Sequence, residues 1–70
     1  MREWDCGSFD SSNGRFWNRL TVKETPEGYQ VLLVSYDRDA GMRKTEQLLG
    51  TFPSLETARV LAWQFSKGRR

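Results

Sequence analysis

The chain contains no histidine and only one cysteine, Cys6, among its 70 residues. A single cysteine cannot form an internal disulfide, and one thiol without histidine does not supply the ligands of a structural zinc site. Nucleophilic arrangements that depend on histidine, such as Ser–His and Cys–His pairs, are excluded too. Cys6 stands beside Asp5 in a mildly acidic segment, where nothing is expected to activate its thiol. We therefore expect a protein that is not an enzyme and that needs no cofactor or metal.

Long hydrophobic runs are also missing. No apolar segment approaches the ~18 residues of a membrane-spanning helix, and the first residues lack the pattern of a signal peptide. The expectation is a soluble cytoplasmic protein with no membrane partner and no small-molecule substrate. A chain this short forms one domain at most, and its core is expected to contribute only about 3–5 kcal/mol of stability. A second copy of the chain or a larger partner is therefore expected to assist it.

Turn sequences divide the second part of the chain into three strands and one helix. Residues 15–23, 29–36 and 42–49 alternate apolar with polar side chains or are rich in β-branched residues, as strands are. A helix is expected from Leu55, because Ser54 is a good N-cap and apolar residues then recur at helical spacing. The predicted fold is α+β: a three-stranded antiparallel β-meander followed by one C-terminal α-helix packed on one sheet face, in the order β-β-β-α.

Residues 1–14 are predicted to be an N-terminal arm, and residues 15–70 a single small domain. The arm is rich in glycine, serine, aspartate and asparagine, which is the composition of turns and loops. It also carries Trp4 and Phe9, although a disordered tail rarely has two large aromatic residues. Either the arm folds back on the domain, or these aromatics contact a partner.

The stretch 48–65 reads LLGTFPSLETARVLAWQF, a strand that stops on a glycine, turns through a proline and starts a capped helix. It resembles the third strand and helix of the AP2/ERF DNA-binding domain, in which L-G-T-F precedes a helix opened by T/S-x-E-x-A. The N-terminal arm-binding domains of phage-type integrases are similar in shape. The matching residues are Leu49, Gly50, Thr51, Phe52, Glu56 and Ala58. The resemblance implies a DNA-binding regulatory protein that docks its three-stranded sheet in the major groove.

The first predicted strand interleaves cations with an aromatic residue, which suits a surface that contacts phosphates and bases. The basic residues at the C-terminus would add non-specific attraction to DNA. The candidate nucleic-acid-binding residues are Arg15, Trp17, Arg19, Lys23, Arg43, Lys44, Arg69 and Arg70. This hypothesis names double-stranded DNA as the partner. The alternatives for the first strand are an ordinary solvated face and a protein-contact surface.

The second hypothesis is a protein–protein interaction module, an adaptor or inhibitor, with a homodimer as one of its forms. The second predicted strand is apolar on both faces, although one helix covers only one face of a sheet. In the helix, Val60 and Trp63 fall nearly opposite the main apolar stripe, and exposed apolar patches mark interaction sites. The candidate interface residues are Leu32, Val34, Tyr36, Leu48, Val60 and Trp63. The two hypotheses differ in which side chains the uncovered face of the sheet presents.

Overall fold

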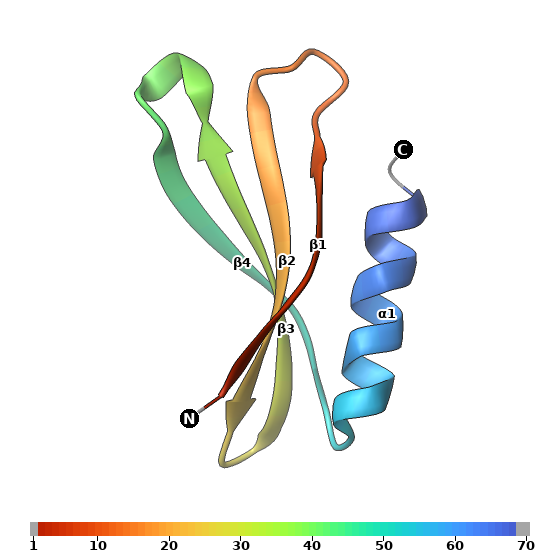
Figure 1. Ribbon diagram of the computed structural model, residues 1–70. Coiled ribbons are helices and arrows are strands. Elements are labelled where there is room, and N and C mark those ends of the chain that lie inside the picture. The colour runs from red at the N-terminus through yellow and green to blue at the C-terminus, as the bar shows by residue number, and fades with distance from the viewer. Residues whose placement is uncertain (1, 69–70) are drawn as a thin grey trace.

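The computed structural model describes residues 2–68, which form one antiparallel sheet and one long helix (Figure 1). In chain order the elements are strands β1 (Glu3–Asp10), β2 (Phe16–Thr25) and β3 (Gly28–Asp37), the short 3-10 helix η1 (Arg38–Ala40), strand β4 (Arg43–Phe52) and helix α1 (Leu55–Gly68). Each strand pairs with the next, in the order β1-β2-β3-β4. The α+β class and the C-terminal helix are confirmed. The predicted count of three strands is wrong, because residues 2–68 contain four.

The additional strand, β1, lies within the segment predicted to be an arm. It pairs with β2, and its register shifts between Asp5 and Ser8, so that Cys6 and Gly7 together stand against one residue of β2. This is a β-bulge. Gly7 adopts a φ of 120°, a backbone conformation that residues with a side chain rarely adopt. The bulge breaks the strict alternation by which a strand is recognised in a sequence. That interruption, together with the turn-like composition, is why β1 was not predicted.

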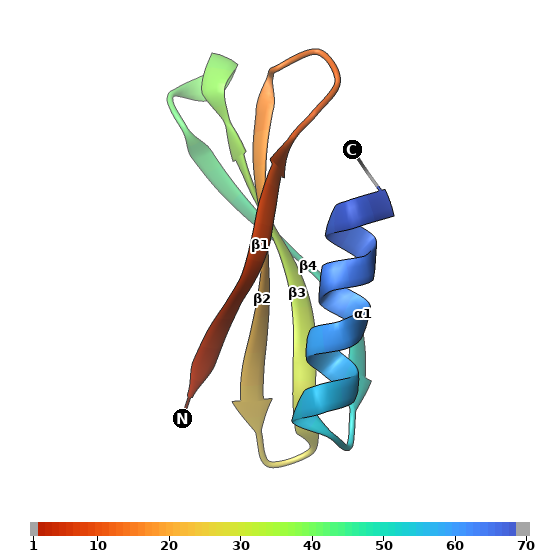
Figure 2. The ribbon, with the colours of Figure 1, turned by 45° about the vertical axis from the view of Figure 1, so that its right-hand side comes forward.

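Helix α1 lies along one face of the sheet (Figure 2). Its Ala58 and Ala62 are fully buried, and these small side chains let the helix approach the strands closely. The aromatic residues of β1 pack against the same core: the ring of Trp4 lies 6.0 Å from that of Tyr29, and Phe9 contacts the helix at Phe65. The N-terminal segment therefore folds back on the domain. The buried cluster consists of Leu20, Val22, Val31, Ala58 and Ala62.

The L-G-T-F segment has a packing role at the end of β4. The pairing of β3 with β4 shifts register beside Leu49, which packs against the core, while Leu48 stays on the other face of the sheet. A Cβ added to Gly50 would lie 2.9 Å from the ring of Phe52, so the glycine makes room for that ring. The segment then enters α1 through Ser54, whose Oγ accepts a hydrogen bond from the backbone N–H of Thr57 at 3.4 Å.

Gly28 closes the two-residue turn between β2 and β3. Its φ is 136°, and an added Cβ would lie only 2.6 Å from the carbonyl oxygen of Phe52 on β4. Gly14, in the loop between β1 and β2, also has a positive φ of 72°, but no atom lies within 4 Å of its Cβ position. A side chain at Gly14 would therefore introduce only backbone strain, whereas a side chain at Gly28 would add a clash with the backbone of β4.

We predict that Gly28→Ala destabilises the protein by about 2–4 kcal/mol, whereas Gly14→Ala costs about 1 kcal/mol, since only the first adds a clash to the strain. Urea unfolding followed by circular dichroism measures both free energies of unfolding. Equal losses for the two variants would contradict the close packing of the β2–β3 turn against β4.

Candidate functional site

The face of the sheet that α1 leaves uncovered carries residues from both functional hypotheses. In the cross-strand pairing, Trp17 lies beside Tyr36, Arg19 beside Val34, and Leu32 beside Leu48. The structure therefore brings the predicted DNA contacts of β2 and the predicted interface residues of β3 onto one surface. We call this surface the open face, and it consists of Trp17, Arg19, Thr21, Lys23, Leu32, Val34, Tyr36, Lys44, Glu46 and Leu48.

Aromatic and long polar side chains cover most of the apolar surface of the open face. Val34 is only 7% exposed although α1 packs on the other side of the sheet. The rings of Trp17 and Tyr36 stack with centroids 5.2 Å apart, and the guanidinium of Arg19 lies 5.7 Å from the centroid of the Trp17 ring. Such side chains bury apolar surface while keeping their polar ends in water. Among the apolar residues of the open face, only Leu48 is more than half exposed.

Carboxylates partner the main cations of the open face. Arg19 Nη2 lies 2.8 Å from Asp5 Oδ2 on β1, and Lys44 Nζ lies 3.3 Å from Glu46 Oε1 on β4. The hydrogen bond that Arg19 donates to Asp5 raises the pKa of the Arg19 guanidinium above its usual value. Because these carboxylates are also negative, they oppose the approach of a phosphate backbone.

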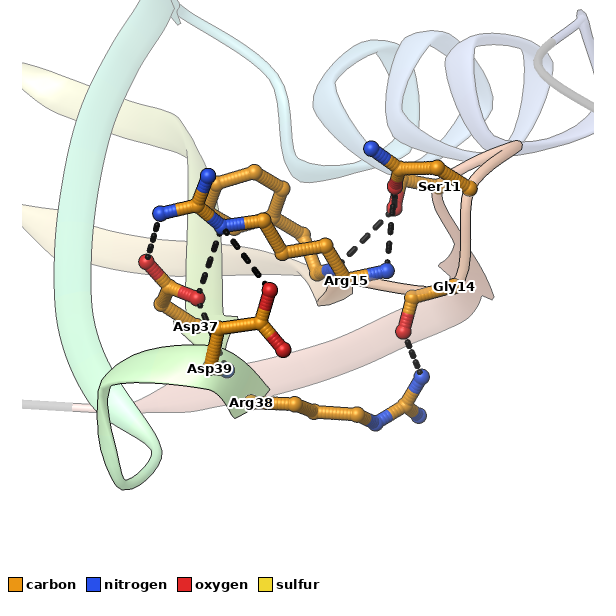
Figure 3. Close-up of polar contacts among 8 residues, drawn as sticks. Ser11, Gly14, Arg15, Asp37, Arg38 and Asp39 are labelled. Carbon is orange, nitrogen blue, oxygen red and sulfur yellow. Dashed lines mark hydrogen bonds and ion pairs between the residues drawn. The ribbon is translucent and has the colours of Figure 1, made fainter.

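Arg15 is held at the end of the sheet where the loops after β1 and β3 lie (Figure 3). Its Nη2 and Nε donate hydrogen bonds of 2.9 and 3.1 Å to the two carboxylate oxygens of Asp37. From η1, Arg38 reaches back to Asp10 at 2.7 Å and donates a second hydrogen bond to the carbonyl of Gly14. These contacts tie the loop after β1 to the loop after β3. Arg15 thus has a structural role at this end of the molecule.

The remaining predicted DNA contacts do not form one surface. Lys23 lies on the open face, paired with Glu3 on one side and with Gln30 on the other. Arg43 is exposed at the start of β4, one position from Lys44, so it is directed to the opposite side of the strand. Arg69 and Arg70 lie outside the described residues.

A wide groove lies between β1 and α1, away from the open face. It has a volume of about 960 Å³, within the usual range of binding pockets. We call it the β1–α1 groove, and it is lined by Asp5, Cys6, Gly7, Ser54, Leu55, Glu56, Arg59, Val60 and Trp63.

The helix wall of this groove is a single stripe of exposed side chains. Glu56, Arg59, Val60 and Trp63 follow one another at intervals of three, one and three residues, which places them along one side of α1. Val60 is 46% exposed and Trp63 is 56% exposed. The ammonium of Lys67, one turn further on, lies 4.8 Å from the centroid of the Trp63 ring. An exposed tryptophan and valine thus stand beside two cations.

The strand wall of the groove is largely backbone. The side chain of Asp5 is directed to the open face, where it meets Arg19, and Cys6 packs against the core. Gly7 has no side chain. Burial raises the pKa of the Cys6 thiol, and the positive charge of Arg59 only partly opposes this effect, so the thiol stays protonated at neutral pH. What this wall presents to the groove is the outer edge of β1.

Sequence reasoning found Val60 and Trp63 but missed Glu56, Arg59 and the β1 wall. The helical spacing of these four side chains could have shown that they share one side of the helix. The β1 wall could not be predicted, because the strand that forms it was not predicted. Within residues 2–68, no group of three or more acidic, cysteine or histidine residues is placed to hold a metal ion. In the same range no helix has the length and hydropathy needed to cross a membrane.

Comparisons with known proteins found no matching family model, no similar curated protein and no similar solved structure. The resemblance of residues 48–65 to the AP2/ERF domain therefore stays a prediction.

We predict that Arg15→Gln raises the pKa of Asp37, which hydrogen bonds from Arg15 hold below its usual value. A lowered pKa in the folded state stabilises the fold above the pKa of the unfolded chain, and this contribution is lost as pH falls through the folded value. The stability difference between wild type and variant should therefore be largest near neutral pH and shrink on acidification. NMR titration of the Asp37 carboxyl and unfolding across pH measure the two effects.

Lys23→Gln serves as the control, because it removes a cation from β2, the strand that follows Arg15, without touching Asp37. An Asp37 titration that is identical in wild type and Arg15→Gln would show that this ion pair does not form in solution.

Proposed function

We propose that the protein is a non-enzymatic protein-interaction module that binds its partner through the β1–α1 groove. The observation that carries this proposal is the exposure of Trp63 and Val60 on the wall of a groove of about 960 Å³. Burying a large side chain such as tryptophan in a partner contributes strongly to binding, and tryptophan is enriched among the residues that dominate interfaces. An exposed apolar pair next to a groove is a costly feature in a small domain unless a partner covers it.

The open face is a weaker candidate than the β1–α1 groove for binding a protein partner. Apart from Leu48, its apolar residues are already buried or partly buried, so a partner would gain little new burial from them. In the groove, Val60 and Trp63 remain 46% and 56% exposed, although the ammonium of Lys67 lies over the Trp63 ring. The interface residues proposed on the sheet, Leu48 excepted, therefore serve the fold more than a partner.

Docking of the sheet on DNA has weaker support. The main cations of the open face are paired with Asp5 and Glu46, and Arg15 is engaged by Asp37. Affinity for a duplex depends on neutralising several phosphates with free cations. A protein partner, in contrast, tolerates a surface on which both signs of charge alternate.

We predict that a photo-crosslinking amino acid placed at Glu56, in the groove, captures a protein in cells of the source organism. The same amino acid at Thr45, exposed on β4, is the matched control and should capture none. Adding Trp63→Ala to the Glu56 variant should remove the adduct, because the tryptophan supplies much of the contact area. Mass spectrometry of the adduct identifies the captured chain and distinguishes a second copy from another protein.

An adduct that persists with Trp63→Ala, or the absence of any adduct at position 56, would contradict the proposal. So would binding to a mixed-sequence duplex whose affinity falls with salt at a slope near −0.9 per phosphate neutralised. That behaviour, lost on Lys44→Gln, would favour the DNA hypothesis instead.

A further inference from the structure

We infer that the occupant of the β1–α1 groove is an extended acidic peptide segment, which adds as a strand to the outer edge of β1. Its apolar side chains would pack on Val60 and Trp63, and one of its carboxylates would pair with Arg59. This inference rests on the proposed function and names the class of partner for the same groove.

Within residues 2–68, nothing pairs with the outer edge of β1, so its outward backbone groups can accept an added strand. The N–H of Glu24 donates to the carbonyl of Arg2 at 2.9 Å, so this pair of residues is a hydrogen-bonded one. In an antiparallel ladder hydrogen-bonded and non-bonded pairs alternate along the strand. Trp4 therefore directs its N–H and C=O toward β2, whereas Asp5 directs both groups outward. Asp5 borders the groove, and its groups are available to an added strand.

The helix wall supplies what an added strand needs on one of its faces. A strand alternates its side chains, so every second residue of a peptide paired with β1 would face α1. The exposed side chains on that wall are Val60 and Trp63, which suit apolar residues. The bulge at Cys6 and Gly7 interrupts the edge and limits the length of the added ladder. The groove thus fits a short extended segment rather than a second sheet.

Charge selects an acidic segment. Arg59 lines the groove and forms no ion pair with a carboxylate within residues 2–68, in contrast to Arg15, Arg19 and Arg38. Lys67 adds a second positive charge beside Trp63. The opposing charges of the groove are Asp5, which is paired with Arg19, and Glu56, which sits in the first turn of α1, where the helix dipole already favours a carboxylate. A peptide carboxylate placed toward Arg59 would therefore find a cation that is free to pair.

The other free edge of the sheet does not offer the same site. Along β4 the residues from Arg43 to Leu48 are exposed, and they include the ion pair of Lys44 with Glu46. Because β1 also carries charged side chains, Glu3 and Asp5, charge alone does not distinguish the two edges. The exposed stripe of α1 accompanies β1 and not this part of β4. Strand addition is therefore assigned to β1.

The test uses three fluorescein-labelled synthetic octapeptides that alternate valine with threonine: one with glutamate in place of a central valine, one with lysine at the same position, and the first with every residue N-methylated. Fluorescence anisotropy measures their affinity for the full chain at about 150 mM salt. The glutamate peptide should bind, and the lysine peptide should bind at least about ten-fold more weakly because it meets Arg59 with a like charge. The affinity of the N-methylated peptide should be about ten-fold lower too, because this peptide cannot donate backbone hydrogen bonds to β1.

Variants of the groove then assign the contacts. Arg59→Glu should reverse the order of the two charged peptides, and Trp63→Ala should weaken both by about ten-fold or more. Thr45→Ala is the matched control and should change neither affinity. Circular dichroism confirms that each variant is folded.

Equal binding of the glutamate and lysine peptides, undiminished binding of the N-methylated peptide, or no binding of the glutamate peptide at millimolar concentration would each overturn the inference. If the Trp63-dependent adduct at position 56 nevertheless forms, the proposed function stands and only the acidic strand is wrong. If that adduct is also missing, both proposals fail.

Discussion

The β-bulge at Cys6 and Gly7 is the constraint on which the rest of the structure depends. A regular strand would direct Trp4 and Phe9 to opposite faces of the sheet, because they stand five residues apart. The extra residue of the bulge brings both aromatics to the face that α1 covers, where they complete the core. Gly7 also lets the helix come close, since a Cβ at this position would lie 3.2 Å from Oγ of Ser66. One irregularity in an edge strand thus closes the core and forms one wall of the groove.

The two surfaces of the molecule follow from how each covers its apolar residues. On the open face, Val34 is only 7% exposed between Arg19 on β2 and Glu46 on β4, and the ring of Trp17 stacks on that of Tyr36, so most of this face needs no partner to bury it. On α1, the small residues Ala58 and Ala62 are fully buried against the sheet, whereas Val60 and Trp63 lie on another side of the helix and stay exposed. Two of the five large apolar side chains that are exposed within residues 2–68, Val60 and Trp63, therefore stand together at the β1–α1 groove, which is the physical reason for placing the function there.

Local pattern was sufficient to predict three of the strands, the helix and its exposed pair Val60 and Trp63, because period-two and helical spacing are visible along the chain. It was insufficient for β1, whose bulge interrupts that period. The burial of Val34 was also out of reach, because it depends on side chains from a neighbouring strand. The L-G-T-F resemblance concerned residues that pack, such as Gly50 beneath the Phe52 ring, and these residues specify a fold more than a partner.

Amide hydrogen exchange along β1, measured by NMR on the free protein, tests the central claim most directly. The claim is that β1 is paired with β2 on one side and open to the groove on the other. The structure predicts a protected amide at Trp4 and a rapidly exchanging amide at Asp5, although both lie in the same strand. Rapid exchange at both residues would mean that the segment is a free arm without a groove. Equal protection at both would mean that the edge of β1 is already occupied.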